Sequence, residues 1–373
     1  MEVNLADYNS SLESLVSALL ILMPTFRHSE LFILVQILTI HKRSIVSAFS
    51  VDESKLSAFY DSMYPGRTNL LKSHWKWLYR AKKLSNAIPL VIEDEGKVIA
   101  HAGMIPFEII VEGKIRTACW YVDFSVLPEY QRQGIGIKMT EEWMNFGDLH
   151  VTFCNHKSLG IFKKFGWSEG EEAISHLLPL LPGNNRNWVK SMPGSMRAIT
   201  NIVSDRLLYP YRKHSYPLTS CSVQKLDKGK LVDFYSKNSE PGTIKNPEYF
   251  DWRILSAPDK DSYKIFQASG CKAKGLIKLK SDNNISVLSL SGSDMSEKVR
   301  LVGSIARWGL HHGCYNLYLL TTDNQLSSSL TSKFGGYISR PTFAYHSKDK
   351  RLEEAFSVQP KFWERIDSDF DLI

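Results

Sequence analysis

Eleven residues at 126–136, with the sequence Val-Leu-Pro-Glu-Tyr-Gln-Arg-Gln-Gly-Ile-Gly, have the composition of a pyrophosphate-binding turn. They join an apolar segment, 120–126, to a segment, 137–146, whose apolar residues recur at helical spacing. The turn therefore precedes a helix N-terminus, where free backbone N–H groups and the helix dipole attract anions. Gly134 and Gly136 have no side chain, so the backbone can approach such a ligand closely.

Two other nucleotide-binding loops are excluded by the residues of this turn. A Rossmann loop needs Gly-x-Gly-x-x-Gly directly after a strand, and a Walker loop needs Gly-Lys-Ser/Thr. The order Gln-x-x-Gly-x-Gly, after Val-Leu-Pro-Glu and before a helix, instead resembles the acetyl-CoA motif of the GCN5-related N-acetyltransferase (GNAT) superfamily. The resemblance implies acetyl-CoA, or another short acyl-CoA, as co-substrate, and no metal.

In that family the strand before the turn splays from its neighbour, and its main chain binds pantetheine. By resemblance, the residues that bind the co-substrate here are Phe124, Val126, Gln131, Arg132, Gln133, Gly134, Ile135, Gly136, Asn155 and Ser158.

A second segment of the family's pattern follows the first. Residues 149–153 read as a strand, Asn155 opens a helix, and that helix closes at Gly166 between two aromatic residues. Many family members carry a tyrosine four residues before this glycine, as the acid that protonates the leaving thiolate. The same position here is Phe162, which has no proton to donate. The family's usual general acid is therefore missing.

Acyl transfer to an amine also needs a base, because an amine with a pKa of about 10 is mostly protonated at neutral pH. Asp123 is the only carboxylate on strand 120–126, but strand alternation turns it away from the face of Val126 unless a bulge re-aims it. His101, on an adjacent predicted strand, is a second candidate. Asp369, in the acidic run 367–371, is a third. Each candidate also has a purely structural interpretation. Asp123 would bond to neighbouring backbone, His101 would pack in the core, and Asp369 would belong to a solvated tail.

Composition describes a globular protein with room for two domains. The chain has 373 residues, 43% of them hydrophobic and 23% charged. Its net charge of +7 fits an anionic ligand, and no basic block with interleaved aromatic residues indicates nucleic acid. The five scattered cysteines include no Cys-x-x-Cys pair, which favours a reducing, cytoplasmic location. One of them, Cys154, lies beside the expected acyl channel.

The chain divides into four predicted parts. Residues 1–44 form an apolar extension whose runs are too short for a stable membrane span, which leaves packed elements or a membrane-surface segment. Residues 45–180 form a GNAT domain with the acetyl-CoA site, 181–217 a linker with a helix, and 218–373 a degenerate GNAT-like domain. The expected fold is α/β (α+β), with two tandem domains, each a mixed, mostly antiparallel sheet flanked by helices.

Internal similarity supports this duplication. Residues 152–167 and 321–336 are identical at six of sixteen positions at a constant offset. At that offset Gly134 corresponds to Gly303, but Gly136 corresponds to Ile305, whose side chain would crowd a phosphate. The sequence therefore predicts one CoA site, in the first domain. The resemblance to tandem acetyltransferases implies that the second domain completes the acceptor cleft.

These observations favour an N-acyltransferase, in the simplest case an N-acetyltransferase, that acts on an amine of a small molecule. Amino sugars of surface-polysaccharide pathways are the favoured acceptors on resemblance alone. Two alternatives stay open: acylation of a peptide or protein amine, and a CoA-binding module without activity, which Phe162 favours. Oligomeric state is left open. Four tryptophans are expected to pack in the core rather than to stack on a sugar: Trp75, Trp77, Trp120 and Trp252.

Overall fold

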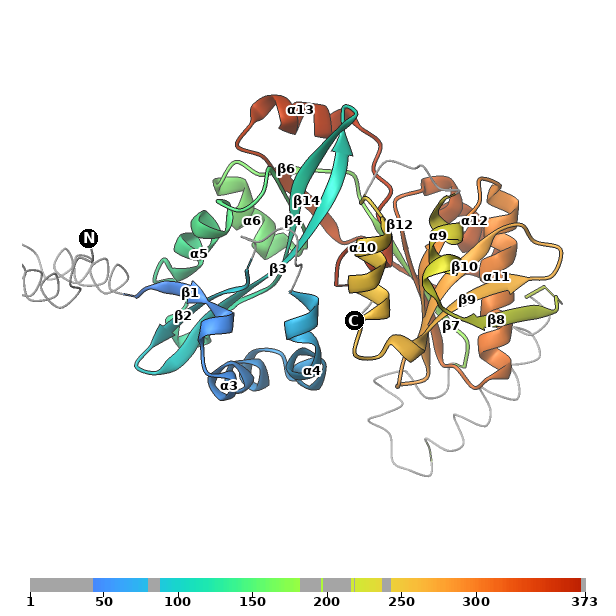
Figure 1. Cartoon of the computed structure of the whole chain (residues 1–373), viewed down its shortest axis with the longest axis horizontal. Helices are drawn as coiled ribbons and strands as arrows, with labels where there is room; N and C mark the ends of the chain where they lie inside the picture. Colours follow the sequence, from blue (N-terminus) through green and yellow to red (C-terminus); the bar gives the residue numbers. More distant parts are fainter. Residues whose placement is uncertain are drawn as a thin grey trace, which may run out of the picture.

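The computed structural model describes residues 43–79, 88–181, 196, 216–217, 219–236 and 243–369. Residues 1–42 of the predicted apolar extension and most of the predicted linker lie outside these residues. Two seven-stranded sheets, each with its own helices, lie side by side in Figure 1. The prediction of an α/β fold with two tandem sheets, each flanked by helices, is confirmed.

The first sheet is mixed and has the order β1-β2-β3-β4-β5-β14-β6. Neighbouring strands are antiparallel except for β4 and β5, which are parallel. Helix α5 (Ile135–Trp143) connects these two, as a parallel connection requires. The strands are β1 (Ile45–Ser47), β2 (Leu90–Asp94), β3 (Lys97–Val111), β4 (Lys114–Val126), β5 (Leu149–Cys154), β6 (Ser168–Glu169) and β14 (Thr342–His346).

The second sheet has the order β8-β9-β10-β11-β12-β7-β13 when it is read from its β8 edge. Only β11 and β12 are parallel, and α11 (Met295–His311) connects them. The strands are β7 (Ile174–Pro179), β8 (Cys221–Lys225), β9 (Tyr263–Ala268), β10 (Lys274–Leu279), β11 (Asn284–Leu290), β12 (Asn316–Thr321) and β13 (Tyr337–Ser339).

The two halves of the chain exchange their last strands. Strand β7, from the first half, lies between β12 and β13, and β14, from the second half, lies between β5 and β6. The green β7 thus lies among orange strands in Figure 1, and the red β14 among green and teal ones. Each sheet is completed by the other half. The domain limits 45–180 and 218–373 remain a prediction, and any such division cuts this exchange.

Several helices begin at a residue whose side chain caps them. Asp52 caps α3 by accepting from the backbone N–H of Ser54, and the helix buries Leu56, Phe59 and Tyr60. The remaining helices are α4 (Thr68–Leu78), α6 (His156–Lys164), α9 (Lys228–Ser236), α10 (Pro247–Phe250), α12 (Asn324–Phe334) and α13 (Lys350–Val358), and α3 itself spans Glu53–Met63.

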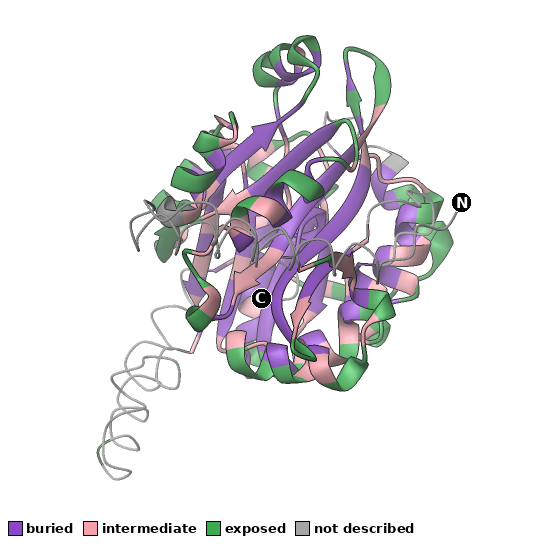
Figure 2. Cartoon of the chain, turned by 90° about the vertical axis from the view of Figure 1, so that its left-hand side faces the viewer, coloured by how far each residue is buried: buried purple, intermediate pink, exposed green. Residues whose placement is uncertain are grey.

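The sheets form the buried layer of the molecule. In Figure 2 the strands are mostly purple, while the outer faces of the helices are green. Trp75 and Trp120 are buried in the first core, as expected. Trp77 and Trp252 join the two halves: each indole N–H donates to the main-chain oxygen of the other residue, at 2.6 and 2.8 Å. The Arg253 guanidinium lies 5.3 and 5.5 Å from their two rings.

Candidate functional site

Strands β4 and β5 separate part-way along their length. They pair only where Ala118–Trp120 lies beside Leu149–Val151, and beyond this they diverge. A cavity of about 280 Å³ lies in the resulting wedge. Its lining comes from both strands, from α6 and from the C-terminal end of the described chain. The lining residues are Tyr64, Trp120, Tyr121, Val122, Asp123, Phe124, Thr152, Phe153, Cys154, Asn155, Ser158, Phe162, Ser368 and Asp369.

The glycine-rich turn lies at the start of α5, next to this wedge. Gly134 is the N-terminal cap with φ of 81°, and no side chain caps the helix. A Cβ at Gly136 would lie 3.3 Å from the ring of Phe124, so a larger residue would press on the wedge. The amides of Gln131 and Gln133 donate to main-chain oxygens within the same turn, at 3.0 and 3.1 Å. The turn is thus held by its own side chains, while the first N–H groups of α5 stay available to an anion.

A bulge in β4 re-aims Asp123. Between the pairs His101–Ser125 and Gly103–Val122, β4 has one residue more than β3, and Asp123 has φ of 48°. The Asp123 side chain is only 1% exposed and accepts from the Tyr79 hydroxyl at 2.5 Å. The alternation expected for an undistorted strand therefore does not hold at this residue.

Gly103 makes room for this contact on the neighbouring strand. A Cβ at Gly103 would lie 2.7 Å from the ring of Tyr79, so only glycine lets that ring reach Asp123. Burial, with the charge of Asp123, holds the pKa of Tyr79 well above its usual value. Tyr79 therefore stays protonated and donates to the carboxylate.

Arg67 joins two of the predicted catalytic carboxylates. Its guanidinium lies 2.5 Å from an Asp123 oxygen and 3.0 Å from an Asp369 oxygen. Burial opposes the charge on Arg67, but the two carboxylates raise its pKa above the usual value. The three side chains form a cluster with two negative charges and one positive charge. Asp369 is the more accessible of the two acids, with 12% of its side chain exposed against 1% for Asp123.

His101 lies outside the cavity lining. It is fully buried, and its two ring nitrogens contact the Tyr60 hydroxyl at 3.2 Å and the main-chain oxygen of Asp123 at 2.9 Å. A carbonyl only accepts, so Nδ1 carries the proton and Nε2 accepts from Tyr60. Burial lowers the pKa of His101 to about 4, against a smaller opposing effect of the bond to Asp123. The His101 ring stabilises the bulge through its bond to the Asp123 main-chain oxygen, and neither of its nitrogens is available to a substrate.

The second motif contributes the opposite wall of the cavity. The Asn155 side chain accepts from the Ser158 backbone N–H at 3.0 Å and so caps α6. Phe162 is buried edge-on against Tyr121, with ring centroids 5.8 Å apart. Burial raises the pKa of the Cys154 thiol to about 11. Cys154 is therefore protonated at neutral pH and is not a poised nucleophile.

Two residues of this site were missed in the sequence. Arg67 follows Pro65 and Gly66 and precedes α4, and Tyr64 is the residue that ends α3. Burial first, then the charge of Asp123, raises the pKa of Tyr64, so its hydroxyl keeps its proton. Neither residue has a local signal, because its role comes from partners far along the chain.

The acidic C-terminal run is not a solvated tail over its described part. The Asp367 side chain is fully buried and lies 3.3 Å from the Lys245 ammonium. Asp369 is in the cavity lining. Asp371 lies outside the described residues.

The predicted correspondence of the phosphate turn in the second domain is wrong. Gly303 and Ile305 lie inside α11 and are buried there, not before a helix. The connection before α11 is short, running from the end of β11 at Leu290 to the cap Asp294, so a constant offset fails across it. The Asp294 carboxylate accepts from the first N–H groups of α11, at 2.8 and 3.3 Å. A fixed carboxylate thus occupies the helix terminus that a phosphate would need.

Comparison with known proteins identifies the first domain. A family model described as an acetyltransferase (GNAT) domain matches residues 56–169, which contain the turn, β2 to β5 and α6. A search of curated proteins found no match. Within the described residues, no helix is long and apolar enough to cross a membrane, and no three His, Cys, Asp or Glu side chains gather as a metal site.

Solved structures share the fold across both domains. A putative acetyltransferase from Pyrococcus horikoshii is 12% identical with a TM-score of 0.53, over 82% of this chain and 90% of that one. Saccharomyces cerevisiae N-myristoyltransferase with bound myristoyl-CoA is 11% identical with a TM-score of 0.53, over 81% and 82%. A GCN5-related N-acetyltransferase from Kribbella flavida is 10% identical with a TM-score of 0.50, over 83% and 73%. The comparisons therefore show a GNAT domain at residues 56–169, and the chain shares the fold of these solved structures over more than 80% of its length.

Proposed function

We propose that this protein is an acyl-CoA-dependent N-acyltransferase, in the simplest case an N-acetyltransferase, that modifies an amine of a small molecule. The observation that carries the proposal is the wedge between β4 and β5. It opens beside the uncapped start of α5 and is lined by Asp123 and Asp369, the two acids that Arg67 joins. The expected anion site at the start of α5 would thus lie next to a cavity with two acidic residues in its lining.

The first domain would bind the acyl-CoA. The N–H groups at Gly134–Gly136 would bind the pyrophosphate, with Gln131, Arg132 and Gln133 shaping or flanking the turn. The main chain of Phe124 and Val126 borders the gap left by the separation of β4 from β5, where it would bind pantetheine.

The acidic cluster would serve the acceptor. The two carboxylates exceed the one guanidinium by a single negative charge, which favours an ammonium group. The amine must lose a proton before its nitrogen attacks the thioester carbon, and Asp369, the more exposed carboxylate, would accept it. Asp123 is held in place by Tyr79, and it would in turn fix the position of Arg67. The C–S bond then breaks, and the Tyr64 hydroxyl would give its proton to the thiolate in place of the tyrosine missing at Phe162. The second proton of the attacking nitrogen, which must leave as the amide forms, would restore the Tyr64 hydroxyl.

The floor of the wedge favours a short acyl group. The Trp120 ring is fully buried, with centroids 5.0 Å from Phe153 and 5.0 Å from Trp363. Trp120 and Phe153 line the cavity, and Trp363 packs against Trp120. An acetyl or another small acyl group would lie against these rings without displacing one of them.

The acceptor class and location rest on less direct support. A small-molecule amine, with amino sugars favoured, follows from the resemblance and from the modest cavity volume. Acylation of a peptide or protein amine is the alternative within the same chemistry. The proposed cytoplasmic location rests on the five cysteines, all of which are free.

A CoA-binding module without activity is the second candidate function, and Phe162 favours it. Mass spectrometry of the purified protein, incubated with acetyl-CoA and a panel of amino sugars, amines and peptides, separates the candidates. A product that carries an added acetyl group on nitrogen supports the transferase and identifies the acceptor class. Tightly bound CoA with no turnover on any acceptor supports the binding module instead.

A further inference from the structure

The second sheet contains a wedge like that of the first. Strands β11 and β12 pair from Asn284–Val287 beside Asn316–Leu319 and then diverge. Only a small cavity of about 40 Å³ remains between them. Part of its lining is Phe362, Trp363 and Glu364, which belong to the end of the chain. We call residues 361–369 the C-terminal strap.

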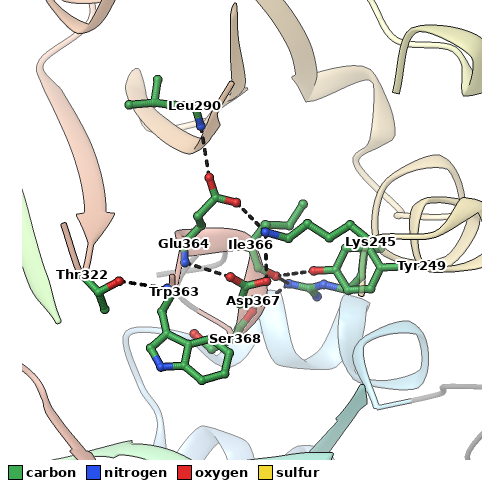
Figure 3. Close-up of polar contacts among 10 residues, drawn as sticks. Lys245, Tyr249, Leu290, Thr322, Trp363, Glu364, Ile366, Asp367 and Ser368 are labelled. Carbon is green, nitrogen blue, oxygen red and sulfur yellow. Dashed lines mark hydrogen bonds and ion pairs between the residues drawn. The ribbon is translucent and has the colours of Figure 1, made fainter. Parts of the chain in front are cut away.

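The strap bonds to backbone and side-chain groups at the point where β11 and β12 diverge. The Glu364 carboxylate accepts from the Leu290 backbone N–H at 3.2 Å, at the end of β11. After β12, the Thr322 hydroxyl donates to the main-chain oxygen of Lys361 at 2.5 Å and accepts from the Trp363 N–H at 3.2 Å. Figure 3 shows Glu364 between Leu290 and Lys245. The strap therefore fills the wedge that in the first domain is open.

Buried charges of the second domain hold the next turn of the strap. The Lys245 ammonium lies 2.5 Å from Glu364 and 3.3 Å from Asp367, and all three side chains are largely buried. The Asp367 carboxylate in turn accepts from the Glu364 N–H at 2.8 Å, which closes the turn (Figure 3). The two carboxylates raise the pKa of Lys245 although burial opposes this, so Lys245 remains charged.

Arg253 holds the strap immediately before Asp369. Its guanidinium donates to the main-chain oxygens of Ile366 and Ser368, at 3.0 and 2.8 Å. The Tyr249 hydroxyl donates to Ile366 as well, at 3.0 Å. Asp369, the next residue, lies beside Arg67 in the first cavity.

We propose that the second wedge is a receptor for the C-terminal strap, and that Lys245 and Arg253 are positioning residues that place Asp369 in the first cavity. The docking of the strap stands on the contacts above, and the consequence for catalysis rests on the proposed function. Asp294 caps the start of α11, so the second domain has no second CoA site there. The proposal gives this domain a different role in the reaction, which is to position Asp369. Small displacements of a reacting group cost large factors in rate, so an anchored strap matters to turnover.

The test uses full-length Lys245→Met, with Lys245→Arg as the conservative variant. Lys228→Met is the matched control, because Lys228 pairs with Asp251 at the surface, with 55% and 46% of their side chains exposed. Hydrogen exchange of the peptide that covers residues 361–369 is followed by mass spectrometry. We expect at least tenfold faster exchange in Lys245→Met, an intermediate rate in Lys245→Arg, and no change in Lys228→Met or in the turn at 131–136.

Kinetics then distinguish positioning from a general loss of structure. We expect Lys245→Met to lower kcat/KM about tenfold or more while CoA affinity stays within about twofold, a pattern typical of a lost transition-state interaction. The double variant of Lys245→Met with Asp369→Asn should be no slower than Asp369→Asn alone, because both act through one carboxylate.

Unchanged strap exchange in folded Lys245→Met overturns the docking proposal, and losses that multiply in the double variant overturn the positioning role. If Lys245→Met does not fold, Glu364→Gln, which removes one charge and keeps the shape, is measured in the same way and should show the same direction of change. A wild-type protein without transferase activity contradicts the proposed function alone, since the exchange experiment still decides whether the strap is held by Lys245.

Discussion

At the scale of single residues, the candidate site depends on one extra residue in β4. The bulge gives Asp123 a φ of 48° and turns its carboxylate toward Arg67 and Tyr79. His101 supports this conformation through the Asp123 main-chain oxygen. An acid that strand alternation would turn away from the cleft thus reaches Arg67, and Arg67 reaches Asp369.

Replacing Asp369 by asparagine tests the acceptor side of the site. The amide keeps the shape but cannot accept the amine's proton, and general-base assistance contributes roughly 10²- to 10⁴-fold to rates. We expect kcat/KM to fall at least about tenfold with CoA affinity unchanged, as measured by steady-state kinetics and calorimetry. Asp61→Asn, at an exposed acid with 57% of its side chain accessible, is the control. Full activity of Asp369→Asn would remove this residue from the mechanism.

Trp120 is expected to set the length of the acyl group. Trp120→Leu removes ring volume from the floor of the wedge, where Phe153 and Trp363 pack against it. We expect the ratio of butyryl-CoA to acetyl-CoA turnover to rise by about tenfold, since each methylene fitted into an apolar pocket is worth roughly 1–3 kcal/mol. Thermal unfolding checks that the variant is folded. An unchanged ratio in the folded variant would place the acyl group elsewhere.

At the scale of elements, the two domains differ in how each crossover helix begins. Helix α5 starts at Gly134 with no side-chain cap, whereas Asp294 caps α11. The same strand, turn and helix therefore present a positive terminus in one domain and a neutralised one in the other.

Gly136→Glu tests whether the start of α5 binds CoA. The new side chain would crowd the Phe124 ring and place a negative charge where the pyrophosphate is expected. We expect calorimetry to show at least a 100-fold loss of CoA affinity, or roughly 2.7 kcal/mol. Gly160→Glu on α6 is the control, because a Cβ there meets nothing within 4 Å. Gly303 is a poor control, since its Cβ would lie 2.7 Å from the Phe334 ring. Equal affinity in Gly136→Glu would contradict the assignment of the turn.

At the scale of the whole molecule, the exchange of β7 and β14 makes each half depend on the other. The reciprocal contact of Trp77 with Trp252 and the C-terminal strap add two further links between the halves. The second domain contributes Ser368 and Asp369 to the cavity and Trp363 to its floor.

Stability of the whole molecule is expected to fall in mild acid. Burial lowers the pKa of His101 and of His150 to about 4 from the usual 6.5. Between these values the unfolded chain binds more protons than the native one, so stability is complete above pH 6.5 and is lost as the pH falls toward 4. Each histidine contributes about 1.4 kcal/mol per pH unit in this window.

Thermal unfolding at several pH values measures this dependence. His150→Phe cannot titrate and should give a shallower slope between pH 4 and 6.5. A wild-type melting temperature that does not change across this window would show that the two rings are not buried in neutral form.

The sequence by itself determined the features whose information is local. Residues 126–136 and 149–167 indicated a strand, a glycine turn and capped helices, because periodicity, glycine conformation and capping depend on neighbours a few residues apart. The same segments indicated the GNAT domain. The identities between 152–167 and 321–336 indicated a second copy.

Only the tertiary structure decided which distant groups meet. The bulge at Asp123 depends on the register of β4 against β3, and Arg67 acts through partners 56 residues away and at the far end of the chain. The strand exchange depends on which sheet offers a free edge. The constant offset placed the second copy's turn inside α11, because the connection before this helix is shorter than the corresponding connection in the first copy. Each of these results from the packing of segments that are remote in sequence, which no local pattern records.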